Sequence, residues 1–461
     1  NGNNANICET CVTVTWEQLN IQLFRLTGEC RFIDQLEKSV YNHLLAAQRP
    51  DGSQWCYYTP LEGIKPYGNS TNCCLSSGPR GVSMLPTFGV TYENKTKRIC
   101  INLYNACSEN IAFGPEKVRV DVAGEYPFVT ESTIHLKLNS EAQFGLALRV
   151  PAWADSMNLW VNKKRVNEPY EKSQYLVLNR SWRDGDEVKV QFPIKAKILS
   201  GDHENAGKAA LLWGPVVFGI DSANLPTGWT PARTSIDMQS KTTSKSVLYN
   251  NVSGEVTLPV SCEYRSNSKT EKRLVDFVPF CNAGADGGRF QIWVRRSDSA
   301  MDPNGNVFEF ATEFRSRMGN VSGDLKGSSL VVTFDARKRE LDWYGYESDE
   351  PVSFNRVTFV HGRSFHDGGW FDTSGVKPTI EIRTTKGGPW QPIGLIKSYP
   401  QTSATENGGL KDGQTFVFNL PTVTAYGIRI SGKPASGDNS NQSFSSCGGL
   451  IVQFIKNSTS I

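Results

Sequence analysis

Long apolar runs and clustered charge are both missing from this sequence of 461 residues. No stretch reaches the roughly 18 consecutive apolar residues that a membrane-spanning helix needs, so we expect no membrane span. Lysine and arginine number 49 against 46 aspartates and glutamates, and the net charge of +3 is spread without a large basic block. Nucleic acid is not an expected partner, because phosphate binding needs a concentrated positive field.

An initiator methionine and a signal peptide are also absent, since the sequence begins at Asn1. We therefore expect a processed or truncated product. No repeat with a fixed period of 20–50 residues is found, which argues against solenoids and propellers. The length exceeds that of one ordinary hydrophobic core, so we expect two to four domains.

Aromatic residues and glycosylation sequons are plentiful. Aromatics make up 11% of the chain, which suits a carbohydrate-handling protein because rings stack on sugar faces, although β-sandwich cores also use aromatics. Seven sequons and 11 cysteines favour a secreted glycoprotein in an oxidising compartment. The sequon asparagines are Asn69, Asn94, Asn179, Asn251, Asn320, Asn441 and Asn457.

Helical periodicity is confined to the start of the chain. Residues 11–48 predict two helices separated at Gly28, the first with a stripe formed by Leu19, Leu23 and Leu26. A third, weaker helix is expected after Cys74. From about residue 98 the pattern alternates in short segments with turn residues between them, so the chain is expected to be multidomain α+β, with helices and strands segregated.

Changes in this pattern predict domain boundaries. The helical part is expected over residues 1–97, followed by a β-sandwich over 98–200 and a second β-region over 201–296. Residues 297–328 are polar and predict a linker or long loops. Short strands over residues 329–461 predict an independent C-terminal β-sandwich of the jelly-roll kind.

Two short segments gather cysteines and a carboxylate. "NICETCVTV" contains Cys8, Glu9 and Cys11, and "NSTNCCLSSGPRG" contains Cys73 and Cys74. Thiolates and carboxylates are zinc ligands, and four of them close a tetrahedral site. The residues alone leave three alternatives open: a disulfide framework, a structural metal or a catalytic thiolate.

The remaining cysteines suggest disulfides. If Cys11, Cys73 and Cys74 stay thiolates, eight cysteines are left, an even number that could pair fully. Cys262–Cys281 and Cys100–Cys107 are plausible pairs on spacing, but spacing does not fix connectivity.

A series of motifs runs through the first 296 residues. In order they are "ETC", "FRLTGECRFIDQLEKSVYNHLLAAQRPDGSQWCYYTPLEG", "NCC" followed by Arg80, "INLY", "LRVPAWA", "YLVLNRSWRDGDEVKVQFP", "AALLWGPVVFGID" and "VPFCNAGADGGRFQIWV". Together they resemble glycoside hydrolase family 127, the β-L-arabinofuranosidase family. The resemblance implies that residues 1–97 are the C-terminal part of an (α/α)₆ barrel, followed by β-sandwich modules.

The same resemblance implies a zinc site and a reaction. The family's ligands correspond here to Glu9, Cys11, Cys73 and Cys74. The first cysteine of the adjacent pair is the family's nucleophile, so Cys73 carries that role. The implied activity is retaining hydrolysis of β-L-arabinofuranosides or related furanosides through a thioglycosyl intermediate.

The chain departs from the family in two ways. The family's general acid/base glutamate lies upstream of "ETC", yet only residues 1–8 precede Glu9 and none is acidic. We therefore expect a second chain, an N-terminal segment or self-association to complete the barrel. The residues after the cysteine pair are "LSS" instead of the family's "PPN", and "FCNAGADGGRF" lacks its usual aromatic and arginine, so the sugar contacts differ.

Other residues near these motifs are candidates for sugar binding. Tyr57, Tyr58 and Glu62 in "CYYTPLEG" could face a sugar pocket, and His43 could line the barrel, although a structural or surface histidine is the alternative. Glu17 could stand in as an acid, but a solvated position on its helix is the simpler expectation.

The C-terminal segments "FNRVTFVHGRSFHDGGWFD", "PTIEIRTTKGGPWQPIG" and "TAYGIRISG" resemble a galactose-binding-like module of the discoidin or F5/8 type. The resemblance implies glycan binding through loops at one end, with His366, Trp370 and Trp390 as candidate contacts. The alternative is a module that only braces the rest of the protein.

Two functions from different classes follow. The first is a secreted, zinc-containing glycosidase acting on arabinofuranosides. The second is a non-catalytic glycan-binding or assembly glycoprotein that keeps the glycosidase scaffold.

Overall fold

The structure is a computed structural model of the whole chain. It describes residues 3, 7–68, 72–113, 116–239, 247–249, 255–265, 270–298, 308, 313–320 and 330–454. The chain divides into two compact units, one over residues 6–298 and the other over residues 299–461 together with residues 1–5. In the described part of the chain, no helix is long and apolar enough to cross a membrane.

The helices of the first unit follow one another closely. Helix α1 covers Thr10–Thr27 and ends at Gly28, whose φ of 70° and N–H bond to the Phe24 carbonyl (2.7 Å) form a left-handed C-cap. Helix α2 (Cys30–Lys38) continues into the π-helix η1 (Ser39–Leu44). The predicted break at Gly28 is confirmed. The other α-helices are α3 (Leu45–Ala47), α4 (Asn72–Met84) and α5 (Pro86–Gly89), and the short 3₁₀ helices η2 (His203–Asn205), η3 (Ser222–Asn224) and η4 (Pro231–Arg233) follow later in the chain.

Helix α1 buries a different face from the one that leucine spacing marks. The residues that pack inward include Val14, Ile21 and Phe24, whereas Leu19 and Leu26 are exposed to 48% and 81%. The leucine stripe is therefore not the face that packs inward, although Leu23 is half-buried. Two apolar stripes compete on this helix, and contact with α2 and α4 decides which one is buried. The outer stripe also contains Val12 and Trp16. The barrel to which these helices would belong remains a prediction.

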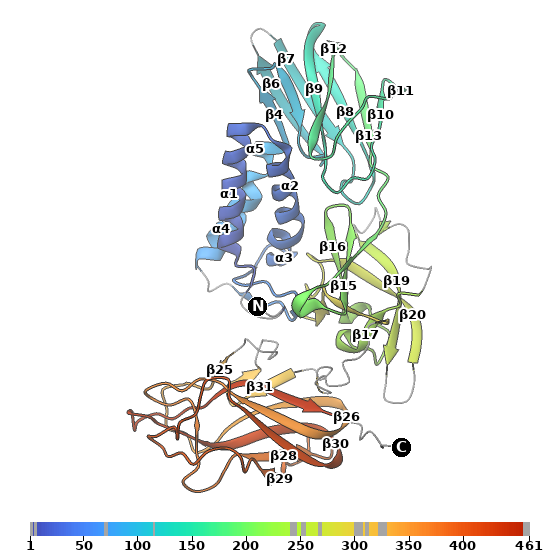
Figure 1. The fold of residues 1–461 in the computed structure, drawn as a ribbon. Helices are drawn as coiled ribbons and strands as arrows, with labels where there is room; N and C mark the ends of the chain where they lie inside the picture. The colour runs from blue at the N-terminus through green and yellow to red at the C-terminus, as the bar shows by residue number, and fades with distance from the viewer. Residues whose placement is uncertain are drawn as a thin grey trace. The chain divides into compact units, whose positions relative to one another are not determined.

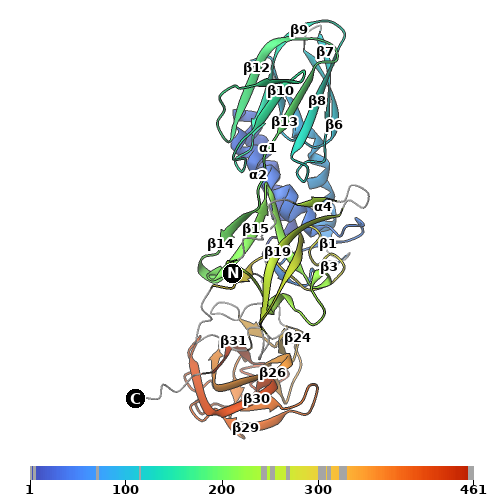
Figure 2. The same ribbon diagram turned by 90° about the vertical axis from the view of Figure 1, so that its right-hand side faces the viewer.

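A β-sandwich follows the helices, and Figure 1 shows α1, α2 and α4 grouped beside it. One sheet has the strand order β11-β10-β13-β8-β7-β6 and the other β12-β9-β5-β4; strands β8, β10 and β13 can be followed side by side in Figure 2. Alternating residues of both sheets fill the core. The strands are β4 (Val90–Glu93), β5 (Arg98–Ile101), β6 (Cys107–Phe113), β7 (Glu116–Ala123), β8 (Glu131–Leu138), β9 (Ala142–Val150), β10 (Asn158–Val161), β11 (Lys164–Val166), β12 (Gln174–Trp182) and β13 (Glu187–Gln191).

A buried ionic network ties helix α2 to this sandwich. The Arg149 side chain is fully buried, and its guanidinium donates to Asp34 Oδ1 and Glu37 Oε1, both at 2.5 Å. Glu37 also accepts from the Tyr126 hydroxyl at 2.5 Å and from the Trp153 indole at 2.9 Å. Each charge in the network is thus paired and hydrogen-bonded, as burial requires.

The second β-region is a single large sheet with the path β14-β15-β22-β17-β19-β20-β16-β21-β2. Strand β2 (Glu62–Gly63) joins it by pairing with β21, so the sheet reaches back to the segment beside the helices. The short strands β1 (Trp55–Cys56) and β3 (Tyr67–Gly68) pair with each other. The other strands are β14 (Lys197–Ser200), β15 (Lys208–Trp213), β16 (Val216–Asp221), β17 (Thr234–Ile236), β18 (Leu248–Tyr249), β19 (Val256–Arg265), β20 (Thr270–Pro279), β21 (Phe290–Gln291) and β22 (Val294–Arg296).

The C-terminal unit is built around two long, paired antiparallel strands, β26 and β30. Two segments that alternate separately in the sequence, "TFVFNL" and "AYGIRI", form one continuous strand, β30. A cluster of buried aromatic and aliphatic side chains fills its core. Its strands are β23 (Glu313–Ser316), β24 (Gly319–Asn320), β25 (Val331–Val332), β26 (Asp342–His361), β27 (Phe371–Asp372), β28 (Thr379–Arg383), β29 (Gln391–Leu395), β30 (Thr415–Pro434) and β31 (Ser446–Gln453).

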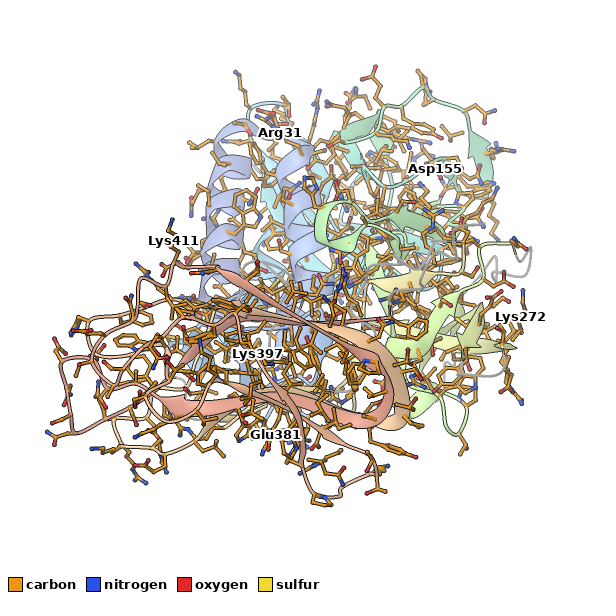
Figure 3. The ribbon with its side chains drawn as sticks, turned by 60° about the horizontal axis from the view of Figure 1, so that its bottom comes forward. Arg31, Asp155, Lys272, Glu381, Lys397 and Lys411 are labelled. Carbon is orange, nitrogen blue, oxygen red and sulfur yellow. The ribbon has the colours of Figure 1, made fainter. Side chains whose placement is uncertain are left out.

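Charged side chains of both signs extend from the surface, among them Arg31, Asp155 and Lys272 in Figure 3. Lys272 Nζ lies 2.9 Å from Asp237 and 2.8 Å from Glu263. Local pairing of this kind is what a nearly neutral chain without a basic block predicts.

Candidate metal and thiolate site

The start of helix α1 is held by a short antiparallel contact with residues 56–59. Thr10 donates its N–H to the Tyr57 carbonyl (3.0 Å) and its hydroxyl to the Cys56 carbonyl (2.8 Å). The Thr59 N–H donates to the Cys8 carbonyl at 3.2 Å. These bonds fix where α1 begins, so Glu9 lies opposite Tyr58 and the Cys11 side chain belongs to the first helical turn.

Helix α4 brings the cysteine pair to this point by packing closely on its neighbours. A Cβ atom at Gly78 would lie 2.3 Å from the Trp55 ring. One at Gly81 would lie 2.9 Å from Val14 Cγ2 and 3.1 Å from Glu17 Oε2. Glycine at both positions therefore permits the close approach of α4 to α1 and to Trp55.

Three thiols meet where the two helices begin. Cys11 Sγ lies 3.6 Å from Cys74 Sγ, which lies 3.8 Å from Cys73 Sγ, and all three sulfurs are within 4.8 Å of one another. A disulfide would bring two sulfurs to about 2.05 Å. A tetrahedron with zinc–sulfur bonds of about 2.3 Å has edges of about 3.8 Å. The sulfur positions therefore fit coordination of one metal ion.

The three cysteines differ in exposure and acidity. Cys73 is exposed, Cys74 is buried and Cys11 is intermediate. A hydrogen bond with the Cys11 thiol lowers the pKa of Cys73, whereas burial raises the pKa of Cys74 to about 12. Cys73 is thus the most accessible and the more readily ionised thiol of the adjacent pair.

Glu9 is next to this cluster without being part of it. Its negative charge raises the pKa of the Tyr57 hydroxyl to about 12. The same charge acts on Cys73. The structure therefore brings the three thiols of the expected ligand set together, and Glu9 lies two residues before Cys11 at the start of α1.

His43, which the sequence offered as a sugar contact, is engaged by protein groups. Its Nδ1 contacts the Thr13 hydroxyl and its Nε2 lies 3.1 Å from the Thr59 hydroxyl. Burial lowers the pKa of the imidazole to about 4. The sequence reasoning missed both threonines, and the only signal was the position of Thr13 two residues after Cys11.

The other proposed sugar contacts lie nearby. The rings of Tyr57 and Tyr58 meet edge to face with centroids 4.7 Å apart. Glu62 accepts a hydrogen bond from the Gln291 side chain (3.3 Å) and lies 3.8 Å from Lys208 Nζ. Its carboxylate is therefore already paired with residues of the large sheet.

Glu17 is buried, with 2% of its surface exposed, which contradicts the expectation of a solvated helix position. Its side chain projects from α1 towards Gly81 of α4, and its Oε1 has no hydrogen-bond partner. Burial raises the pKa of the carboxyl to about 8. Leucine spacing did not predict this burial, because Glu17 lies on the face of α1 opposite to the leucine stripe.

Replacing Glu17 by glutamine should remove a pH dependence of stability. Its folded-state pKa lies above the unfolded value, so its contribution favours folding at acid pH and is lost as the pH rises from about 5 to 8. The expected slope is on the order of 1 kcal/mol per pH unit in the free energy of unfolding. Urea unfolding from pH 5 to 8 measures it, with exposed Glu168→Gln as the control. Equal slopes for wild type and Glu17→Gln would contradict a buried carboxyl.

All eleven cysteines, which lie in the described part of the chain, are free. The expected pair Cys100–Cys107 is not formed, because the two residues lie on strands of different sheets, β5 and β6. Cys100 also lies between Ile99 and Ile101, which both face the sandwich core, so its side chain takes the opposite face. Cys262–Cys281 is not formed either.

The candidates in the C-terminal unit differ in accessibility. Trp370 is 3% exposed and its indole N–H donates to the Ser403 carbonyl (2.9 Å), so it belongs to the core and cannot contact a glycan. The Trp390 ring centre lies 4.4 Å and 4.6 Å from the guanidinium carbons of Arg383 and Arg429. His366 is exposed and forms a 2.9 Å ion pair with Asp438.

The sequons fall partly on the described surface. Asn94, Asn179 and Asn441 are exposed. Asn320 belongs to strand β24. Asn69, Asn251 and Asn457 lie outside the described residues.

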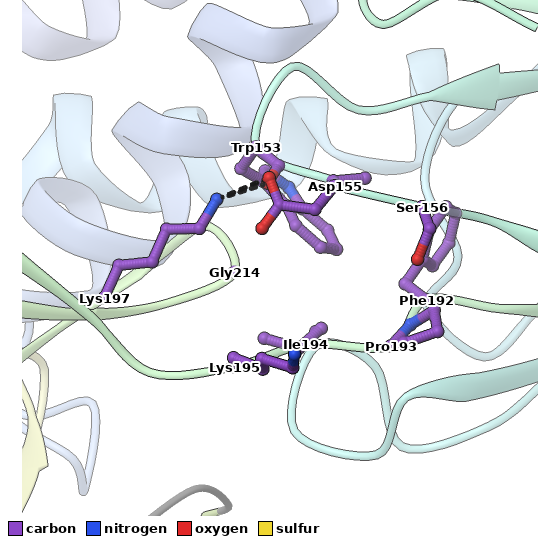
Figure 4. A pocket seen from close by; sticks show the side chains of 10 residues that line it. Trp153, Asp155, Ser156, Phe192, Pro193, Ile194, Lys195, Lys197 and Gly214 are labelled. Atoms are coloured by element: carbon purple, nitrogen blue, oxygen red, sulfur yellow. Dashed lines mark hydrogen bonds and ion pairs between the residues drawn. The ribbon is translucent and has the colours of Figure 1, made fainter. Parts of the chain in front are cut away.

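A small hollow beside Trp153 is too small for a sugar. It has a volume of about 10 Å³ and lies between the Trp153–Ser156 turn and Gly214. At the edge of this hollow, Lys197 Nζ forms an ion pair with Asp155 Oδ1 at 2.8 Å (Figure 4). A space of this size holds about one water molecule.

Two segments of the chain match models of known protein families. Residues 2–87 match a family model described as the beta-L-arabinofuranosidase GH127 catalytic domain, and residues 98–194 match the GH127 middle domain. A curated relative, the non-reducing end beta-L-arabinofuranosidase of Bifidobacterium longum subsp. longum, is 24% identical over 243 residues. That alignment covers 47% of this chain and 36% of the relative.

Solved structures share the fold of the first unit. A GH127 beta-L-arabinofuranosidase from Geobacillus stearothermophilus T6 gives a TM-score of 0.58 at 21% identity, covering 64% of this chain and 51% of its own. Another GH127 beta-arabinofuranosidase gives 0.56 at 20% identity, covering 63% and 50%. The chain thus spans about a third of the curated relative and half of the solved ones, and the comparisons together support a relation to glycoside hydrolase family 127.

Proposed function

We propose that the first unit is the nucleophile-bearing and metal-binding part of a retaining glycosidase that hydrolyses β-L-arabinofuranosides or related furanosides. The observation that supports this most is the set of three sulfurs spaced at 3.6 and 3.8 Å, with Cys73 exposed. The matches to the GH127 catalytic and middle domains agree with it.

Cys11, Cys73, Cys74 and Glu9 would hold a zinc ion, as the donor types and the sulfur spacing allow. When bound, zinc keeps its thiol ligands deprotonated at neutral pH. The antiparallel backbone contact between Glu9 and Tyr58 would hold the Glu9 main chain near Cys11.

The exposed Cys73 sulfur would attack the anomeric carbon of the sugar as the bond to the leaving oxygen breaks. A water molecule would then displace the sulfur, and the two inversions together retain the configuration. Protonation of the leaving oxygen requires a general acid, which we assign to a segment outside residues 1–461 or to a second chain.

The outer stripe of α1, formed by Val12, Trp16, Leu19 and Leu26, supports this assignment. These side chains are 45–81% exposed, and contiguous apolar surface of this kind marks an interaction site. We propose that further helices of an (α/α)₆ barrel cover it in the complete enzyme.

Secretion and glycosylation are part of the proposal. Three exposed sequons, Asn94, Asn179 and Asn441, support it. We further propose that the C-terminal unit binds glycans through the loop that contains the exposed His366.

Trapping the covalent intermediate tests the proposed function. An aryl β-L-arabinofuranoside with a good leaving group needs no general acid, so the chain should react with it even without the rest of the barrel. Acid quenching and peptide mass spectrometry should then show one pentosyl group on Cys73. Cys107→Ser should label like the wild type, because Cys107 is on strand β6, away from the thiol cluster. Zinc-loaded wild type without label would favour a non-catalytic, glycan-binding scaffold.

A further inference from the structure

The His43 ring is surrounded by polar groups from two different segments. Nδ1 contacts the Thr13 hydroxyl, and Nε2 lies 3.1 Å from the Thr59 hydroxyl. Thr59 is fully buried. Both nitrogens of the imidazole therefore have partners within the protein, and neither is left to bind a sugar.

Both hydroxyl partners of His43 belong to segments that carry the thiol site. Thr59 donates its N–H to the Cys8 carbonyl at 3.2 Å, and Cys8, whose φ of 53° is rare for a residue with a side chain, precedes Glu9. Thr13 follows Cys11 by two residues on α1. Thr59 follows Tyr58, which lies opposite Glu9 in the antiparallel contact. The ring thus connects both sides of the antiparallel contact that begins α1.

The backbone that carries His43 is itself anchored. His43 belongs to the π-helix η1, a form that occurs mostly as short insertions at functional sites. The adjacent Asn42 donates to the carbonyls of Lys38 (2.8 Å) and Pro215 (2.9 Å) and accepts from the Val217 N–H (2.8 Å). Strand β16 and its turn therefore hold η1, and the imidazole projects from a fixed base.

We infer that His43 is a positioning residue of the metal site, which holds the segment Cys8–Thr13 against Thr59 and so sets the relative placement of Glu9 and Cys11. This inference rests on the proposed metal site. It assigns His43 no contact with the metal or with substrate. Second-layer groups of this kind typically change metal affinity by about 10- to 100-fold when they are removed.

Cobalt substitution of the full chain tests the inference without any measurement of activity. Thiolate-bound Co²⁺ gives charge-transfer absorption that reports ligand geometry, and competition with a chelator gives the affinity. His43→Leu should bind Co²⁺ at least about 10-fold more weakly than wild type and show altered charge-transfer bands. His43→Gln, which keeps a donor and an acceptor, should recover part of both.

His361→Leu is the matched control. His361 is also a buried imidazole with a hydroxyl partner, Ser364 at 3.1 Å, but it lies in the C-terminal unit. The control should keep wild-type bands and affinity.

The outcomes separate the two proposals. Wild-type bands and affinity in His43→Leu would overturn the positioning role and leave the metal site standing. If His43→Leu does not fold, Thr59→Val decides instead, because it removes the hydroxyl that lies 3.1 Å from His43 Nε2. Wild-type bands and affinity in Thr59→Val would then overturn the positioning role. A wild-type protein without thiolate–cobalt absorption would overturn the metal site, and the positioning role with it.

Discussion

Cys73→Ser should lose turnover of an activated aryl β-L-arabinofuranoside, falling to the rate of the uncatalysed reaction. Cys73 is the exposed member of the thiol cluster, and its acidity is enhanced by Cys11. A serine hydroxyl at this position is a far weaker nucleophile than a thiolate. Removing a nucleophile commonly costs on the order of 10³-fold or more in turnover, so initial-rate measurement of aryl release resolves the effect.

Two further variants separate the loss of the nucleophile from the loss of the metal. Cys11→Ala should release the metal and lose turnover together, because it removes one of the three clustered sulfurs. Cys107→Ser should keep both. Zinc content measured on every variant shows which step failed, and unchanged turnover in Cys73→Ser would reject Cys73 as the nucleophile.

Arg149→Met should lower the free energy of unfolding of the first unit by about 3–5 kcal/mol, because it leaves two carboxylates buried without their counter-charge. Asp34 and Glu37 both bind the guanidinium at 2.5 Å, and Arg149 has no exposed surface. Hydrogen exchange in increasing urea, read on peptides from β8 and β9, measures the loss in this unit separately from the C-terminal one.

The control for Arg149 is an exposed ion pair in the same sandwich. Arg183 donates to Glu141 at 3.0 Å with 75% of its side chain exposed, so Arg183→Met should cost less than about 1 kcal/mol. Adding Asp34→Asn and Glu37→Gln to Arg149→Met should regain part of the lost stability, since no buried charge then remains unpaired. Equal losses in Arg149→Met and Arg183→Met would show that the network does not stabilise the fold.

Sequence pattern predicted the local structure well where one signal dominated. Gly28 ends α1 because only a left-handed residue completes the cap, and alternation from residue 98 onward produced strands. Sequence pattern failed to predict which face of a helix is buried where two apolar stripes overlap on the same helix. On α1 the leucine stripe remained outside while Glu17 and Asn20 were buried, since the choice depends on which face meets α2 and α4.

The candidate site was likewise predicted only in part from the sequence. The motifs "ETC" and "NCC" identified the residues that meet, but the distances among their sulfurs depend on the close packing of α4 at Gly78 and Gly81. The partners of His43 lie 30 and 16 residues away from it in the chain. No local pattern in the sequence reveals such contacts, because folding alone brings these hydroxyls to the ring.

If the three cysteines and Glu9 hold one zinc ion, X-ray absorption at the zinc edge should show it. The full chain, purified without chelator or added metal, should contain about one zinc with three sulfur neighbours at about 2.3 Å and one oxygen at about 2.0–2.2 Å. A zinc-free chain with Cys73 or Cys74 in a disulfide, or zinc without sulfur neighbours, would contradict the account.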